Sequence, residues 1–121
     1  MQMTISSGPG WELVTLDGEL TSEKTSELEE LLQRFLTVGR YNVILDLSAL
    51  RYIGSAGLSL LIRYTNACRR WERGDLHLAA VPPIIQNLFQ VAGLVTEDQS
   101  SFSIYSTLDA AQEAAQKRAS Q

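Results

Sequence analysis

One serine has the sequence surroundings of a reactive residue. Ser55 stands in the run Gly54-Ser55-Ala56-Gly57, which follows a strand-like segment and opens a helix-like one. Serine hydrolases place their nucleophile on such a turn, but Ile53 occupies the position of the first glycine in their G-x-S-x-G motif. Hydrolysis would also require His77 or Asp46 within hydrogen-bond reach of the serine hydroxyl. We therefore do not expect Ser55 to be a catalytic nucleophile.

The other residues that bind metals or attack substrates are isolated. His77, the only histidine, falls in the middle of an apolar strand pattern, which favours a structural role. Cys68, the only cysteine, lies on the apolar face of a predicted helix, which favours a buried, unreactive thiol. The arginines between Arg63 and Arg73 form a basic patch that we interpret as a solvated helix face. We expect no metal, no cofactor and no enzymatic activity.

Ser55 is better placed for modification than for attack. The predicted central strand ends near Leu47, and the loop 48–54 then brings Ser55 to the N-terminal end of a helix. Its hydroxyl either caps this helix, which would contribute about 1 kcal/mol, or carries a phosphate held by the same free N–H groups. Asp46, which we expect near Ser55, would order the loop or repel that phosphate.

The residues around this serine predict a docking surface. Tyr52, Ile53 and Leu58 would supply apolar contacts wherever they are exposed, and Gly54 and Gly57 keep the surface low. A phosphate placed inside such a surface would repel a partner electrostatically, or would cost free energy because binding removes its water.

Alternating strands and helices must position these residues. Two short β-prone runs, 3–5 and 11–16, flank a turn-forming cluster and predict an N-terminal hairpin. Helical spacing or propensity marks four segments, which are 21–39, 58–68, 84–91 and the Ala-rich stretch after the capping box 106–109. The remaining strands are expected at 43–47, 75–81 and 102–105. This order predicts an α/β fold with a mostly parallel sheet, an antiparallel N-terminal hairpin and about four helices.

Length and charge narrow the function classes. The 121 residues suit one domain, 1–121, in which we expect the chain to fray from Lys117 onward. The formal net charge of −4 argues against a partner held by its phosphates, such as nucleic acid. The lone cysteine fits a reducing compartment, and we see neither a secretion signal nor an apolar run of membrane-spanning length. We expect a cytoplasmic protein.

Four motifs in order along the chain resemble the STAS domains of the anti-sigma-factor antagonist family, small bacterial proteins that act by partner switching. The matching runs are Asp17-Gly18-Glu19-Leu20, Val43-Ile44-Leu45-Asp46-Leu47-Ser48, Tyr52-Ile53-Gly54-Ser55-Ala56-Gly57-Leu58 and Val91-Ala92-Gly93-Leu94. The resemblance implies a STAS fold. It also implies that Ser55 matches the residue phosphorylated by an anti-sigma kinase of the GHKL type and dephosphorylated by a dedicated serine phosphatase. The unphosphorylated antagonist then binds the anti-sigma factor and frees sigma, and the phosphorylated form releases it.

Two positions depart from the family pattern. Gly54 replaces the aspartate usual before the phosphorylated residue, and Thr21 replaces an aspartate common after the Gly-Glu-Leu run. The leading hypothesis is a regulatory binding module with Ser55 as its switch and the seven residues Tyr52 to Leu58 as its contact surface. The alternative hypothesis, which Gly54 favours, is a constitutive structural STAS subunit of a transporter complex or stress-sensing assembly.

Overall fold

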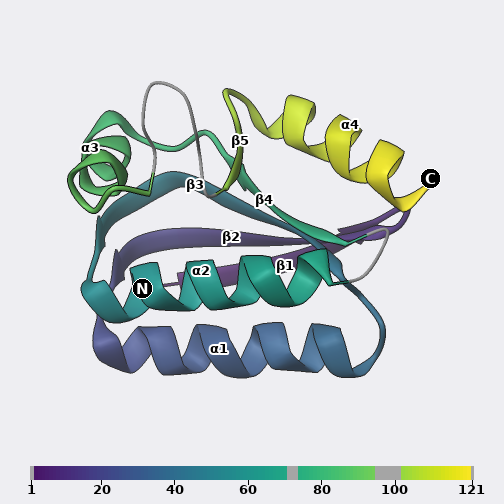
Figure 1. Ribbon diagram of the computed structural model, residues 1–121, viewed down its shortest axis with the longest axis horizontal. Coiled ribbons are helices and arrows are strands. Elements are labelled where there is room, and N and C mark those ends of the chain that lie inside the picture. Colours follow the sequence, from purple (N-terminus) through teal and green to yellow (C-terminus); the bar gives the residue numbers. More distant parts are fainter. Residues whose placement is uncertain (1, 71–73, 95–101, 121) are drawn as a thin grey trace.

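The structure, a computed structural model, describes residues 2–70, 74–94 and 102–120. Five strands and four helices alternate along this part of the chain (Figure 1). They are β1 (Gln2–Gly8), β2 (Trp11–Leu20), α1 (Ser22–Thr37), β3 (Asn42–Ile53), α2 (Ser55–Arg69), β4 (Asp75–Ala79), α3 (Pro83–Val91), β5 (Ser103–Tyr105) and α4 (Leu108–Ala119). The strands form one sheet in the order β1-β2-β3-β4-β5. Strand β1 is antiparallel to β2 and the other pairs are parallel, which confirms the predicted fold class.

The sheet separates two apolar layers of unequal size. Helices α1 and α2 cover one face and α4 covers the other (Figure 1). Val43 and Leu45 of β3 belong to the larger core, whereas Ile44 between them belongs to the smaller core with Ala111 and Ala115 of α4. All three β3 residues are completely buried. A nearly unbroken apolar run is the pattern expected of a parallel strand covered on both faces.

The helix ends follow their sequence signals closely. Gly39 after α1 and Gly93 after α3 have φ angles of +80° and +76°, the left-handed conformation expected of a residue just past a helix end. At α4 the N-cap is Thr107, whose side chain accepts a hydrogen bond from the Ala110 amide at 3.1 Å. The predicted capping box, which began at Ser106, was therefore wrong by one residue.

Strand β3 is longer than the sequence indicated. The expected end near Leu47 and the loop 48–54 are wrong, because β3 continues to Ile53 and only Gly54 separates it from α2. Its pairing with β2 shifts register between Thr15 and Asp17 and again between Gly18 and Glu19. Such irregularities insert extra residues into a strand and interrupt the alternation of buried and exposed side chains. The exposed stretch therefore resembled a turn in sequence.

The C-terminal helix extends past Lys117, where we expected the chain to fray. Helix α4 continues through Ala119. The Arg118 guanidinium donates from Nε and Nη2 to the Gly74 carbonyl at 3.3 and 3.2 Å. Ala119 also packs close to Gly10 in the turn between β1 and β2. Both contacts join segments distant in sequence, so local helix propensity could not reveal them.

Candidate functional site

Ser55 is the first residue of α2 and its side chain is exposed. The N-cap is Gly54, with φ −88° and ψ 177°, and no side chain caps the helix. The interpretation of Ser55 as the capping residue is therefore wrong. The hydroxyl remains available at the surface.

The backbone around Ser55 favours negative charge. The first hydrogen bond of α2 runs from the Leu58 amide to the Gly54 carbonyl at 3.0 Å. The N–H groups of Ser55, Ala56 and Gly57 precede it, so no carbonyl of the helix accepts from them. The first turn of α2 contains no acidic residue. A phosphate on the Ser55 hydroxyl would therefore lie beside the positive end of the helix dipole without a like charge in the same turn.

The two glycines that flank Ser55, Gly54 and Gly57, differ in whether packing requires them. A Cβ atom on Gly57 would come within 2.7 Å of Ile53 Cγ1 and 3.0 Å of Leu20 Cδ2, so the close packing of the first turn of α2 against these side chains requires a glycine here. At Gly54 the nearest atom to such a Cβ would be Tyr52 Oη, at an ordinary 3.5 Å. The Gly54 amide also donates to the Leu20 carbonyl at 3.3 Å, which ties the turn to β2. Packing demands a glycine at 57 but permits a side chain at 54.

The predicted contact stretch, Tyr52 to Leu58, is only partly available. Tyr52 is 49% exposed, and Ser55 and Ala56 are exposed with Leu58 half-buried beside them. Ile53 is 3% exposed and packs in the larger core with Leu58 against it, and Gly57 is buried. The expected contribution of Ile53 to a contact patch is therefore wrong. We define the Ser55 surface as the exposed and half-buried residues of this stretch, namely Tyr52, Gly54, Ser55, Ala56 and Leu58.

Two neighbouring features were missed by sequence reasoning. Helix α3 lies at the same end of the sheet as the start of α2, at the left in Figure 1. Its outer side exposes Ile84 by 61% and Val91 by 79%, and the helix contains no charged residue. The seven-residue spacing of these two side chains places them on one helix face. That spacing was the signal that could have identified an exposed apolar face.

The second missed feature is a polar groove beside Tyr52. It has a volume of about 360 Å³ and lies where β2 ends and α1 begins, with Glu19 paired to Tyr52 in the sheet register. Its lining residues are Gln2, Asp17, Gly18, Glu19, Thr21, Lys24 and Arg51. Thr21, one of the two departures from the family pattern, therefore lies next to the Ser55 surface. The groove combines carboxylates with cations and has no single sign of charge.

Asp46 does not reach the Ser55 surface. It lies inside β3, paired with Thr15 and Ala79, and its Oδ1 accepts from the Ser48 amide at 3.0 Å. Seven strand residues follow it before β3 ends, a span of about 23 Å at about 3.3 Å per residue. The prediction that Asp46 stands at the strand end near Ser55 is wrong, because the strand continues where a loop was expected.

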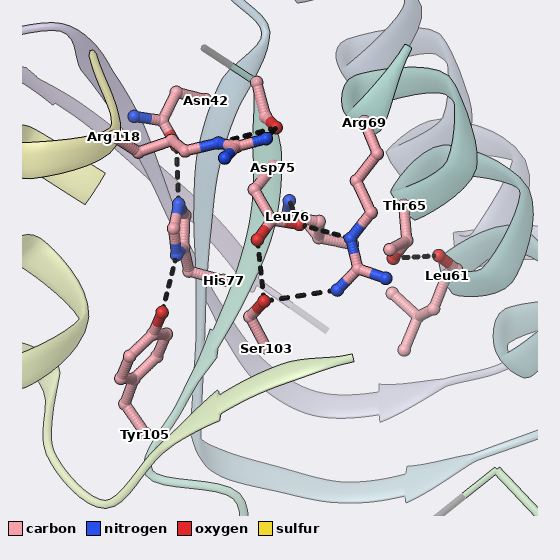
Figure 2. A network of polar contacts seen from close by, with 11 residues as sticks. Asn42, Leu61, Thr65, Arg69, Asp75, Leu76, His77, Ser103, Tyr105 and Arg118 are labelled. Atoms are coloured by element: carbon pink, nitrogen blue, oxygen red, sulfur yellow. Dashed lines mark hydrogen bonds and ion pairs between the residues drawn. The ribbon is translucent and has the colours of Figure 1, made fainter. Parts of the chain in front are cut away.

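His77 is also remote from Ser55. It is 2% exposed, and its ring lies between Asn42 and Tyr105 (Figure 2). The neighbouring Ala79 of the same strand faces the small core under α4, whereas α2 covers the opposite face. Because neither His77 nor Asp46 approaches the serine hydroxyl, the arrangement required for a hydrolase is not formed.

The remaining candidate residues have structural partners. Cys68 is completely buried, and burial raises the pKa of its thiol to about 12. Arg63 forms an ion pair with Glu29 at 2.8 Å and Arg69 with Asp75 at 2.9 Å, so two arginines of the predicted basic patch are paired with carboxylates. Arg73, at the end of that patch, lies outside the described residues.

Within the described parts of the chain, no helix has the length and apolarity to cross a membrane. Likewise, no group of three or more His, Cys, Asp or Glu side chains among those residues is arranged to hold a metal ion.

Comparison with known proteins gives a consistent result. A family profile described as "Mlab, STAS domain" matches residues 4–97. The chain is 29% identical over 96 residues to BtrV of Bordetella bronchiseptica, which is named as a candidate anti-sigma factor antagonist. This alignment covers 79% of this chain and 82% of BtrV. The crystal structure of a candidate anti-sigma factor antagonist from Thermotoga maritima superposes with a TM-score of 0.81 at 18% identity, covering 93% of each chain. Phosphorylated SpoIIAA of Bacillus superposes with a TM-score of 0.64 at 18% identity, covering 80% of this chain and 94% of SpoIIAA.

Proposed function

Because the chain belongs to the STAS-domain family, we propose that it is an anti-sigma-factor antagonist controlled by phosphorylation of Ser55. The unphosphorylated protein binds an anti-sigma factor through the Ser55 surface. The phosphorylated protein releases it, and a serine phosphatase restores binding. The similarity to BtrV supports the class of partner.

The observation that carries this proposal is the position of Ser55 itself. An exposed hydroxyl at the first residue of α2 is open to a kinase. The N-terminus of α2 then stabilises the phosphoserine, because its free N–H groups can donate to the phosphate and its dipole favours negative charge. A protein with the same fold, SpoIIAA of Bacillus, has been solved in a phosphorylated form, so this fold tolerates the modification.

Release follows from the electrostatics of docking. A phosphate adds roughly −1.5 to −2 charges at neutral pH. In the free protein these charges are solvated, whereas in the complex they would be buried among apolar residues such as Tyr52 and Leu58. Burial without a cation to pair them is strongly unfavourable. The exposed face of α3, with Ile84 and Val91, extends the apolar part of the docking surface.

The kinase that we propose is the anti-sigma factor itself, of the GHKL type, acting in the cytoplasm. The test is phosphosite mapping by mass spectrometry of the protein isolated from its native cells. The informative tryptic peptide runs from Tyr52 to Arg63 and also contains Ser59, which serves as an internal control. Phosphate on Ser55 supports the proposal. Phosphate on Ser59 alone would mean that Ser55 is not the regulated residue.

A second candidate function is a structural STAS subunit that is never phosphorylated. Gly54 favours it, because the family resemblance places an aspartate there and the site has room for a side chain. In that case Ser55 stays unmodified in every growth condition, and Ser55→Glu leaves assembly with the partner intact.

A further inference from the structure

A line of polar side chains crosses the sheet beneath α4. His77 of β4 lies with its Nε2 2.5 Å from Asn42 Oδ1 of β3 and its Nδ1 3.3 Å from Tyr105 Oη of β5 (Figure 2). The Asn42 amide nitrogen donates in turn to the Ala115 carbonyl of α4. We call this chain of four groups the His77 relay. It connects three strands to the helix.

The direction of each hydrogen bond in the relay is fixed from the α4 end. The Ala115 carbonyl can only accept, so Asn42 turns its amide nitrogen to α4 and its oxygen to His77. That oxygen can only accept, so Nε2 of His77 carries a proton. Nδ1 of the neutral ring then accepts from the Tyr105 hydroxyl. The neutral form of His77 therefore satisfies every group.

Charged groups around the relay act in opposite directions on His77. Burial is the largest effect and lowers the pKa of the imidazole, and Arg118 of α4 and Arg69 of α2 lower it further. Asp75 of β4 opposes them, but its carboxylate already accepts from Arg69 Nε at 2.9 Å and from Ser103 Oγ at 2.6 Å. A proton on Nδ1 would also force the Tyr105 hydroxyl to turn and accept. Burial and the hydrogen-bond pattern therefore favour the neutral form of His77 in the docked state.

Helix α4 buries a smaller apolar face than α1 does. Its fully buried side chains are only Ala111 and Ala115. Helix α1, in contrast, buries Leu28, Leu31, Leu32 and Phe35 along with Thr25. Helix α4 is therefore held by a small apolar contact with the smaller core, by the relay and by Arg118 on the Gly74 carbonyl. All five strands precede α4, so it can leave the sheet without separating any strand pair.

We propose that α4 is an acid-released latch: the neutral His77 relay holds it on the sheet, and protonation of His77 releases it and uncovers the apolar strip Trp11, Leu13, Ile44 and Ala79. This latch is independent of phosphorylation at Ser55. Once α4 leaves, water reaches His77, whose pKa returns toward its ordinary value of about 6.5. The docked state is therefore fully favoured above about pH 6.5. Below that value the opening constant rises about tenfold per pH unit until the lower pKa of the docked state is reached.

Hydrogen exchange measured by mass spectrometry on the full chain tests this proposal. Amide protection factors, corrected for the intrinsic pH dependence of exchange, are compared between α4 and β3 from about pH 7.5 to about pH 5.5. We expect protection of α4 to fall below about pH 6.5, by at most about tenfold per pH unit, while β3 stays protected. Constant protection of α4, or a joint loss in α4 and β3, would overturn the proposal.

Two variants identify His77 as the sensor. Glutamine at this position can donate to Asn42 and accept from Tyr105 but gains no proton in this range, so His77→Gln should keep α4 protected at both ends of the pH range. Asn42→Leu breaks the relay and should leave α4 open at every pH, with β3 protection confirming that the protein is folded. If Asn42→Leu does not fold, His77→Gln alone decides. An acid-induced loss of α4 protection in His77→Gln equal to that of the wild type would refute the assignment.

Discussion

Substituting aspartate for Gly54 should stabilise the protein, because nothing in the structure requires glycine there. The φ and ψ angles of −88° and 177° are accessible to any residue. A Cβ atom would contact Tyr52 Oη at 3.5 Å and the Leu20 carbonyl oxygen at 3.9 Å, both ordinary distances. The new carboxylate would lie at the N-cap of α2, where it can accept from the free N–H groups of the first turn.

Three contributions set the size of the effect. Aspartate is better than glycine as an N-cap by a few tenths of a kcal/mol. Its charge gains about 0.3 to 1 kcal/mol from the helix dipole. Loss of glycine's freedom in the unfolded chain contributes about 0.4 to 1 kcal/mol. The expected stabilisation by Gly54→Asp is therefore about 1 to 2 kcal/mol, or a rise in Tm of roughly 4 °C per kcal/mol for a domain of this size.

Urea unfolding followed by circular dichroism measures this difference. Gly54→Asn is the matched control, since it retains the cap but lacks the charge. Aspartate should exceed asparagine at low salt, and the difference should shrink at high salt as the dipole interaction is screened. A loss of stability in both variants would refute the assignment of residue 54 as the N-cap of α2.

Three further predictions use the same turn and the core behind it. Gly57→Ala should cost about 1 kcal/mol in urea unfolding, because overpacking against Ile53 and Leu20 at about 1 to 3 kcal/mol exceeds a helix-propensity gain of about 1 kcal/mol; a stabilised variant would mean that this contact relaxes freely. Ser55→Ala should change the free energy of unfolding by less than about 0.5 kcal/mol, since no side chain caps α2; a loss above about 1 kcal/mol would show that the hydroxyl does cap. Cys68, buried and with a thiol pKa of about 12, should not react with Ellman's reagent in the native protein at mildly alkaline pH and should react fully after denaturation; rapid native reaction would contradict its burial.

Local patterns predicted the element order but not the extent of β3. Val43, Ile44 and Leu45 form an apolar run that indicates a buried strand in any context. The continuation to Ile53 depends on pairing with β2 across two register shifts, and sequence periodicity contains no information on that pairing. The position of Ser55 at the helix start was predicted, whereas its separation from Asp46 followed from the longer strand.

Long-range partners account for the other differences. His77 is buried and hydrogen-bonded, as its expected structural role requires, but its partners Asn42 and Tyr105 lie 35 and 28 positions away and could not be identified from the sequence. Arg63 and Arg69 appeared as a basic patch because Glu29 and Asp75 reach them only in the folded chain. Contacts between distant segments follow from the sheet order, which spacing within one segment does not specify.

The most direct test of the proposed switch compares the affinity of unmodified and Ser55-phosphorylated protein for the anti-sigma factor by isothermal titration calorimetry. Protein with phosphoserine at Ser120, exposed at the far end of α4, is the matched control for added charge. An unpaired charge buried in an interface costs about 2 to 5 kcal/mol, so phosphorylation at Ser55 should weaken binding by at least about 30-fold while the control binds normally. Equal affinity of the unmodified and Ser55-phosphorylated forms would contradict the switch.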